Sequence, residues 1–420
     1  MSAVTELDLP HFDYFSPDLR GGRFHETMLD LRGRGWLARN ELAVFVLDRE
    51  AGEFFLRSRA TTFPGLELAE LFGVTDGPLA EEMRRNILHI NGDDHRRLRN
   101  LVNPAFTPRA ADRYRPVMRG FLDDLWAGVR DAGRCEFVGA IAKPYPALTI
   151  ATVLGAPADD APRLHEWSNT IQRQFDGPFL VAHRPRIEAA VDELYAYLSD
   201  LLERRRASPG DDLISTLLAA EAAGDRLSDV ELVNLVLNVL IGGIDTTQSQ
   251  LAHAVRLLAE HPDQWAALRA DPGLADAAVQ EALRYEPITP FTARIALEEL
   301  EYRGVTFPQG TIVMVSAFTG NRDPADHDEP DRFDITAPRP RTRLLTFGAG
   351  VHYCLGANLA QAELQEALRH LADGVDELAL DGEPVYEEVT GIYGLAELPL
   401  RMTPSRAAGA SASAKRRASA

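Results

Sequence analysis

The chain has 420 residues, of which 45% are hydrophobic, so it is long enough and apolar enough to bury a large core. Its formal net charge of −19 argues against nucleic acid as a general partner. Length alone would suggest two or three domains, but no linker is visible before residue 400. We therefore expect one domain over residues 1–405, followed by an Ala/Ser/Arg-rich tail, 406–420, that is predicted to be disordered.

The N-terminal segment carries no recognisable targeting signal. Residues 1–10 contain acidic residues and proline, whereas a signal sequence has a basic and then an apolar region. The most apolar run, residues 235–244, is shorter than the ~20 residues that span a bilayer. Strand-like stretches lie near residues 42–47 and 299–315, and residues 112–285 are mainly helical in pattern. We expect a cytoplasmic, mainly α protein with a small β region.

The chain has two cysteines, Cys135 and Cys354. No sequence feature favours a disulfide between them, and Cys135 has no motif around it. Neither a Cys-x-x-Cys nor a His-Glu-x-x-His pattern is present, so zinc is not indicated.

A long helix is predicted from residue 228 to about residue 260. It opens with a capping box, Ser-Asp-Val-Glu at 228–231. Gly242 and Gly243 lie in its middle, where each costs about 1 kcal/mol against alanine. Asp245 and Thr246 then interrupt the apolar stripe. The Thr246 hydroxyl can bond to the Gly242 carbonyl, which bends helices, and a hydroxyl beside a carboxylate can relay protons. A locally weak, solvated helix turn would give the same pattern.

Glu281 and Arg284 lie three residues apart and can pair on one helix face. Surface helices contain this spacing often, so the pair alone indicates little. The sequence Pro-Asp-Arg-Phe at 330–333 follows about fifty residues later.

The segment 347–356, Phe-Gly-Ala-Gly-Val-His-Tyr-Cys-Leu-Gly, is the most informative in the chain. Cys354 by itself would most often be a small buried apolar residue. However, Gly350 and Gly356 on either side allow a close approach of the backbone to a ligand. Backbone amides that point at a metal-bound thiolate tune the metal, so the loop indicates a thiolate ligand.

Phe347, Gly350, Cys354 and Gly356 stand where the haem-binding signature F-x-x-G-x-x-x-C-x-G of the cytochrome P-450 family places them. Residues 242–247 are similar to that family's A/G-G-x-D-T-T, residues 281–284 to its E-x-x-R, and residues 330–333 to its P-x-R-F. The chain resembles the family over roughly residues 10–403. The resemblance implies the cytochrome P-450 fold, with haem between the long central helix and the cysteine loop.

The resemblance also implies roles for individual residues. The Cys354 thiolate is the expected axial ligand of haem b. Asp245 and Thr246 are the expected proton-delivery residues. The positions that match propionate partners are His95, Arg99, Arg294 and His352. The positions that match a buried structural network behind the loop are Glu281, Arg284 and Arg332.

The substrate pocket is predicted from family position alone. Its expected parts are the stretches 66–87 and 175–180, with Asn238, Ile241, Gly242, Ile288, Thr289, Phe291 and Ile392. Core packing explains these residues equally well. The expected lining is largely apolar, as in most small-molecule sites.

The implied reaction is insertion of one atom of O2 into a small organic substrate, by hydroxylation or epoxidation, in secondary metabolism. Electrons are expected from NAD(P)H through a separate ferredoxin reductase and ferredoxin. The protein itself is expected to be a monomer. The basic residues Arg339, Arg341 and Arg343 would dock an acidic ferredoxin, although a solvated loop accounts for them as well. A peroxide-driven haem-thiolate enzyme and a haem protein that senses a ligand without turnover stay as alternatives. The Asp245–Thr246 pair argues against both.

Overall fold

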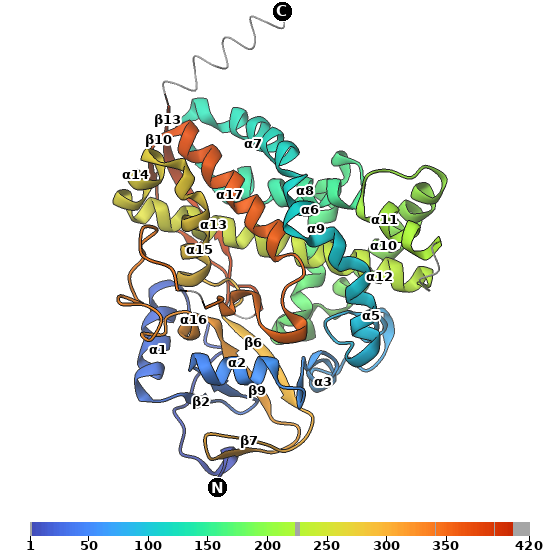
Figure 1. Cartoon of the computed structure of the whole chain (residues 1–420), viewed down its shortest axis with the longest axis vertical. Coiled ribbons are helices and arrows are strands. Elements are labelled where there is room, and N and C mark those ends of the chain that lie inside the picture. The colour runs from blue at the N-terminus through green and yellow to red at the C-terminus, as the bar shows by residue number, and fades with distance from the viewer. Residues whose placement is uncertain (1, 223–226, 341, 390, 406–420) are drawn as a thin grey trace, which may run out of the picture.

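The computed structural model describes residues 2–222, 227–340, 342–389 and 391–405. Helices fill most of the molecule, and the larger β-sheet lies at the end near the N-terminus (Figure 1). The prediction of a mainly α fold with a small β region is confirmed. The predicted tail, 406–420, lies outside the described residues.

The helices are α1 (Gly21–Arg34), α2 (Arg49–Arg57), α3 (Gly65–Leu71), α4 (Gly77–Arg85), α5 (Gly92–Val102), α6 (Pro108–Asp112), α7 (Arg115–Val129), α8 (Pro144–Leu154), α9 (Ala161–Gln172), α10 (Gly177–Ala207), α11 (Leu213–Ala222), α12 (Asp229–Gly243), α13 (Asp245–Glu260), α14 (Pro262–Ala270), α15 (Ala275–Tyr285), α16 (Ala317–Gly320) and α17 (Ala357–Gly374). Side-chain caps begin several of them, because the first amides of a helix have no partner inside it. Asp48 accepts from the Ala51 amide at 2.8 Å at the start of α2. The predicted capping box of α12 is confirmed: the Ser228 amide donates to Glu231 at 2.9 Å, and the Glu231 amide donates to Ser228 at 3.3 Å.

The strands are β1 (Ser2–Ala3), β2 (Leu37–Arg39), β3 (Val44–Val46), β4 (Thr61–Thr62), β5 (Arg134–Glu136), β6 (Phe291–Ala296), β7 (Leu300–Tyr302), β8 (Val305–Phe307), β9 (Ile312–Ser316), β10 (Val375–Leu380), β11 (Val385–Tyr386), β12 (Leu395–Glu397) and β13 (Pro399–Pro404). The largest sheet has the order β2-β3-β9-β6-β4, with β3 and β9 parallel. A second sheet has the order β10-β13-β5. The strand-like stretches predicted near residues 42–47 and 299–315 are therefore confirmed. Within the predicted helical region, β5 is an exception.

Three clusters of buried apolar side chains hold these elements together. The largest joins the helices α3 to α15 and α17, and a second lies beneath the large sheet. A third is rich in aromatic rings, including Phe12, Phe24, Phe45 and Phe291. The stretch Asp229–Glu260 is long and apolar enough to cross a bilayer by composition, with a mean hydropathy of 1.4. However, 61% of that apolar window is buried inside the fold, which is typical of a core helix.

Candidate active site

The cysteine loop connects the large sheet region to helix α17. Short 3-10 turns at Leu345–Phe347 and Gly350–His352 precede Cys354, whose amide donates to the Phe347 carbonyl at 2.9 Å. Gly350 has a φ of +73°, and a Cβ there would lie 2.7 Å from the Leu56 carbonyl oxygen at the end of α2. Only glycine fits this position, because any larger residue would meet backbone atoms and a strained conformation.

The Cys354 sulfur faces a hollow inside the fold. The side chain is exposed by surface area, yet protein surrounds it closely enough that burial raises its pKa. The amides of Gly356 and Ala357 donate to the sulfur and lower that pKa, as does the Arg99 guanidinium. A Cβ at Gly356 would meet no atom within 4 Å, so the space beside this amide is open. The arrangement places the Cys354 sulfur just before α17, with two backbone amides directed at it and open space beside it.

The structure brings His95, Arg99, Arg294 and His352 together near Cys354. The His95 and His352 rings lie 4.4 Å apart, and Arg99 donates to the Tyr353 carbonyl at 2.8 Å. Burial, together with the charges of His95, Arg294 and Arg99, lowers the pKa of His352 to about 3. The four residues come from three elements. His95 and Arg99 lie on α5, Arg294 lies on β6, and His352 lies in the cysteine loop.

Arg99 and Arg294 have no carboxylate partner among the described residues. Arg294 is 3% exposed, and its side chain donates to the Ala293 carbonyl at 2.8 Å. Burial lowers its pKa to about 10, with no carboxylate in the described parts of the chain to offset that effect. A buried guanidinium is costly without a partner. The cluster is therefore suited to bind an anionic group that occupies the hollow in front of Cys354.

The long central helix is interrupted at Ile244, between α12 and α13. The Thr246 hydroxyl donates to the Gly242 carbonyl at 2.6 Å, as the sequence predicted. The two glycines serve different purposes. A Cβ at Gly243 would lie 2.5 Å from Ile150 of α8, whereas one at Gly242 would enter open space. Gly243 therefore permits close helix packing, and Gly242 leaves room beside Thr246.

Asp245, the first residue of α13, is almost completely buried. Its carboxylate accepts from the Ser168 hydroxyl at 2.7 Å and from the Asn169 amide at 3.2 Å, both on α9. Burial raises its pKa, and these two hydrogen bonds and the His165 charge oppose that shift. A carboxyl group with a raised pKa binds a proton more readily than an ordinary carboxyl group and is suited to carry one.

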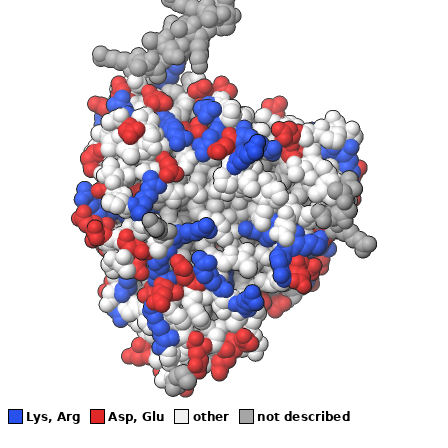
Figure 2. Space-filling view, viewed as in Figure 1, with Lys and Arg blue, Asp and Glu red and all other residues white. Residues whose placement is uncertain are grey.

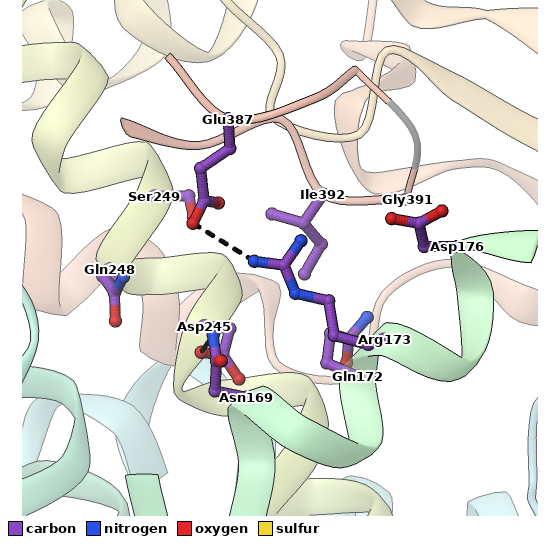
Figure 3. A pocket seen from close by; sticks show the side chains of 10 residues that line it. All are labelled: Asn169, Gln172, Arg173, Asp176, Asp245, Gln248, Ser249, Glu387, Gly391 and Ile392. Carbon is purple, nitrogen blue, oxygen red and sulfur yellow. Dashed lines mark hydrogen bonds and ion pairs between the residues drawn. The ribbon is translucent and has the colours of Figure 1, made fainter. Parts of the chain in front are cut away.

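A small polar cavity of about 20 Å³ adjoins Asp245 (Figure 3). In Figure 3 the Arg173 side chain crosses this cavity toward Glu387, and their ion pair measures 3.2 Å. The volume accommodates about one water molecule. Ile392, which was predicted to line the substrate pocket, borders this polar cavity.

The predicted Glu281–Arg284 pair is present, and it is tied to the segment that follows α16. Arg284 donates twice to Glu281, at 2.7 Å each, and to the carbonyls of Pro330 and Arg332 at 2.6 and 2.7 Å. Glu281 also accepts from the Asp334 amide at 2.9 Å.

The prediction that the Arg332 side chain belongs to this buried network is wrong. That side chain is 55% exposed and pairs with Glu329 at 3.0 Å, so only its carbonyl takes part. The arginine that is buried nearby is Arg322, which donates to the carbonyls of Phe318 and Tyr285 and lies over both rings. Sequence reasoning missed Arg322, although it stands in the polar stretch Asn-Arg-Asp-Pro at 321–324.

The predicted pocket residues divide into core and partly accessible positions. Phe291 packs against Phe12 and Phe45, at ring distances of 5.7 and 5.3 Å, so it belongs to the core and not to a pocket wall. Ile241 and Ile288 are buried as well. The Asn238 amide accepts from the Ile87 amide at 2.9 Å and donates to Glu82 at 3.2 Å.

The Asn238 side chain therefore holds the segment after α4 in place and is not a free polar anchor. Gly242 and Thr289 keep accessible surface, as do Leu66 and Ile87 in the predicted stretch 66–87.

Basic side chains gather on the face that carries α17, while acidic ones lie mainly toward its rim (Figure 2). Arg339 pairs with Asp276 at 2.8 Å. Arg343 is exposed and lies 5.6 Å over the Tyr353 ring, next to Cys354. Arg341 lies outside the described residues.

The sequence reasoning also missed the partners of Asp245. Ser168 and Asn169 lie 77 and 76 residues upstream of it, and no motif marks them. His165, one turn earlier on α9, lies 3.9 Å from Asp245.

Comparisons with known proteins agree with one another. A family model described as Cytochrome P450 matches residues 74–372. Luteothin monooxygenase of Streptomyces thioluteus is 36% identical over 399 residues, which cover 94% of this chain and 96% of that protein. Erythromycin C-12 hydroxylase of Saccharopolyspora erythraea is 39% identical over 297 residues, which cover 70% and 74%. The crystal structure of CalO2 aligns with a TM-score of 0.86 at 32% identity, covering 94% of this chain and all of the other (100%).

Proposed function

This chain belongs to the cytochrome P450 family, and we propose that it inserts one atom of O2 into a small organic, largely apolar substrate of secondary metabolism. That it is an oxygen-incorporating oxidoreductase follows from its relatives, among them a monooxygenase and a hydroxylase. The relatives' names support a secondary metabolite as substrate and hydroxylation or epoxidation as the reaction.

The observation that carries the proposal is the Cys354 sulfur beside two guanidinium groups, Arg99 and Arg294, that have no carboxylate partner among the described residues. This donor set fits haem b, whose iron takes an axial thiolate and whose two propionates need cationic partners. When bound, the haem supplies the redox-active iron that reacts with O2. Cys354 would hold the iron, and His95, Arg99, Arg294 and His352 would bind the propionates.

Phe347, Gly350 and Gly356 would keep the loop in place around the sulfur. The Phe347 carbonyl fixes the Cys354 amide, and Gly350 allows the loop to pack on α2. The amides of Gly356 and Ala357 would stabilise negative charge on the sulfur. Glu281 and Arg284 hold the segment around residue 332, and we assign them a structural role.

Asp245 and Thr246 would deliver the protons that reduction of O2 consumes. Thr246 Oγ1 is held at the open side of the helix break by the Gly242 carbonyl. The Asp245 carboxylate accepts a proton on Oδ1 or Oδ2 and can pass it inward when its bonds to Ser168 and Asn169 release.

Electrons would come from NAD(P)H through ferredoxin reductase and ferredoxin, in the cytoplasm. The exposed Arg343 beside Tyr353 of the cysteine loop supports docking of an acidic ferredoxin there. Arg343→Glu should slow ferredoxin-driven reduction, whereas Arg134→Glu, an equal charge change at exposed β5, should not. Equal rates in both variants would contradict docking at this face.

The proposal is tested with the haem-loaded protein in two steps. A panel of small apolar compounds is first screened for changes in the visible spectrum of the haem. The strongest ligand is then incubated with NAD(P)H, ferredoxin, ferredoxin reductase and O2, and the product is examined for one added oxygen atom from labelled O2. Label from water, or product that forms with peroxide but never with NAD(P)H, the redox partners and O2, would contradict the proposal. Thr246→Ala should lower the product formed per NAD(P)H consumed.

A further inference from the structure

His165 lies in the wall between an open surface groove and the buried Asp245. The groove, about 460 Å³ in volume, runs between the starts of α8 and α9, and the His165 side chain is part of its lining. On the inner side, His165 Nε2 lies 2.7 Å from the Gln248 amide oxygen and 3.9 Å from Asp245 Oδ1. The side chain is 18% exposed, whereas that of Asp245 is 6% exposed. His165 is therefore accessible from outside and reaches the proton-delivery carboxylate inside.

The hydrogen bond to Gln248 defines which ring nitrogen can receive a proton. Because the amide oxygen of Gln248 accepts, Nε2 must carry the hydrogen. In the neutral ring Nδ1 is then the acceptor. The ring can therefore take up a proton at one nitrogen and release another from the nitrogen that faces Asp245.

The alternative route from solvent to Asp245 is the small polar cavity in Figure 3. The ion pair of Arg173 and Glu387 crosses it, at 3.2 Å. A guanidinium does not give up its proton in a protein, so Arg173 cannot carry protons itself. The route through His165 instead offers an imidazole ring, which can bind a proton at one nitrogen and release one from the other.

We propose that His165 is the residue through which protons pass from the surface groove to Asp245. The proposal rests on the monooxygenase function proposed above. His165 touches neither substrate nor haem, and it acts through Asp245. A hydronium ion in the groove gives a proton to Nδ1 and becomes water, and the imidazolium gives its Nε2 proton to Asp245 Oδ1. The ring is left neutral with its hydrogen on Nδ1, the carboxylate becomes a carboxylic acid, and no electrons move.

The step requires the Nε2–H bond to exchange from Gln248 to Asp245, which lie on the same side of α13 three residues apart. The charged groups around the ring are Lys143 and Asp159 at the groove and Asp245 inside. Arg173 also acts on Asp245 through its charge.

The first test compares His165→Gln with Glu387→Gln in the haem-loaded protein, using the strongest ligand of the screen as substrate. Glutamine keeps a side-chain donor near Gln248 but cannot relay a proton. His165→Gln should slow O2-driven product formation, by up to about 100-fold. Glu387→Gln, which opens the other route, should match the wild type. Peroxide brings its own protons, so any peroxide-driven product formation should be equal in all three proteins.

A second readout needs no turnover. The infrared band of the protonated Asp245 carboxyl, assigned by its loss in Asp245→Asn, is followed against pH in the haem-loaded protein. The positive charge of His165 lowers the pKa of Asp245, so His165→Gln should shift this titration to higher pH. If His165→Gln forms as much product per NAD(P)H consumed as the wild type, and the titration of Asp245 does not shift, the proposed role of His165 is overturned. If only Glu387→Gln forms less product per NAD(P)H consumed, the proton route to Asp245 is assigned to the polar cavity in Figure 3. Absence of any O2-dependent product in the wild type would instead contradict the monooxygenase function.

Discussion

Glu281 should be one of the most sensitive positions in the fold, although it is far from the reacting atoms in our proposal. Its carboxylate faces Arg284, whose side chain is 5% exposed. Arg284 Nε and Nη2 each lie 2.7 Å from one of the two carboxylate oxygens. Glu281→Gln keeps the size and most of the shape of the side chain but removes the charge. The Arg284 guanidinium would then stay buried with only carbonyl oxygens around it.

The expected cost follows from this burial. Removing one partner of a buried ion pair costs about 3–5 kcal/mol, because the remaining charge is left uncompensated. Two charge-assisted hydrogen bonds, at about 1.5–3 kcal/mol each, give a similar figure. We expect the free energy of unfolding of Glu281→Gln to fall by an amount in this range, with faster loss of haem.

The measurement is urea unfolding of the haem-loaded protein, followed by circular dichroism and by haem absorbance. Arg332→Gln is the matched control, because the exposed Arg332 side chain is outside the network and its carbonyl is retained. That variant should unfold as the wild type does. A loss below about 1 kcal/mol for Glu281→Gln, or an equal loss in the control, would refute the reasoning.

Four further substitutions test other parts of the structure. Glu363 is buried on α17, and its pKa is well above its usual value. Above pH 4.5 the unfolded chain releases the Glu363 proton, whereas the folded chain keeps it. The free energy of unfolding therefore falls as pH rises. Glu363→Gln should remove up to about 1.4 kcal/mol per pH unit of that decline. Urea unfolding at pH 5 and pH 8 measures it. If the unfolding free energy of the variant falls with pH as steeply as that of the wild type, the raised pKa of Glu363 is contradicted. Gly350→Ala should weaken haem retention, because its Cβ would lie 2.7 Å from a backbone oxygen; undiminished retention in a haem-transfer assay would argue against this. Gly243→Ala should destabilise by about 1–3 kcal/mol through overpacking, whereas Gly242→Ala should not destabilise but should alter ligand affinities in the spectral screen. Equal thermal stability of the two glycine variants would be inconsistent with the packing described.

Local signals in the sequence were sufficient for the cysteine loop and for the break in the central helix. The glycine pair at 242–243, followed by Asp245 and Thr246, defines a bend through contacts within one turn, and the Thr246 bond to Gly242 is such a contact. The capping box at 228–231 is local in the same way. These features depend on neighbours in the chain, so the chain order alone reveals them.

Contacts between distant segments were not accessible to the same reasoning. The motif at 330–333 located the segment near Arg284, but not whether the side chain or the carbonyl of Arg332 faces it. Asn238 resembled a pocket residue, yet its partners Ile87 and Glu82 lie 151 and 156 residues away in sequence. Which side chain is buried there depends on packing that no single segment encodes.

The contact of Gly350 with the end of α2 links two parts of the chain that are nearly 300 residues apart. The loop is fixed on its other side by α17, so the sulfur position depends on both the sheet-bearing region and the helical one. Small displacements of α2, for instance from substitutions on its sheet-facing side, should therefore change the electronic environment of the bound iron. Substitutions on α2 should therefore shift the reduction potential of the haem iron while every side chain assigned to the haem stays unchanged.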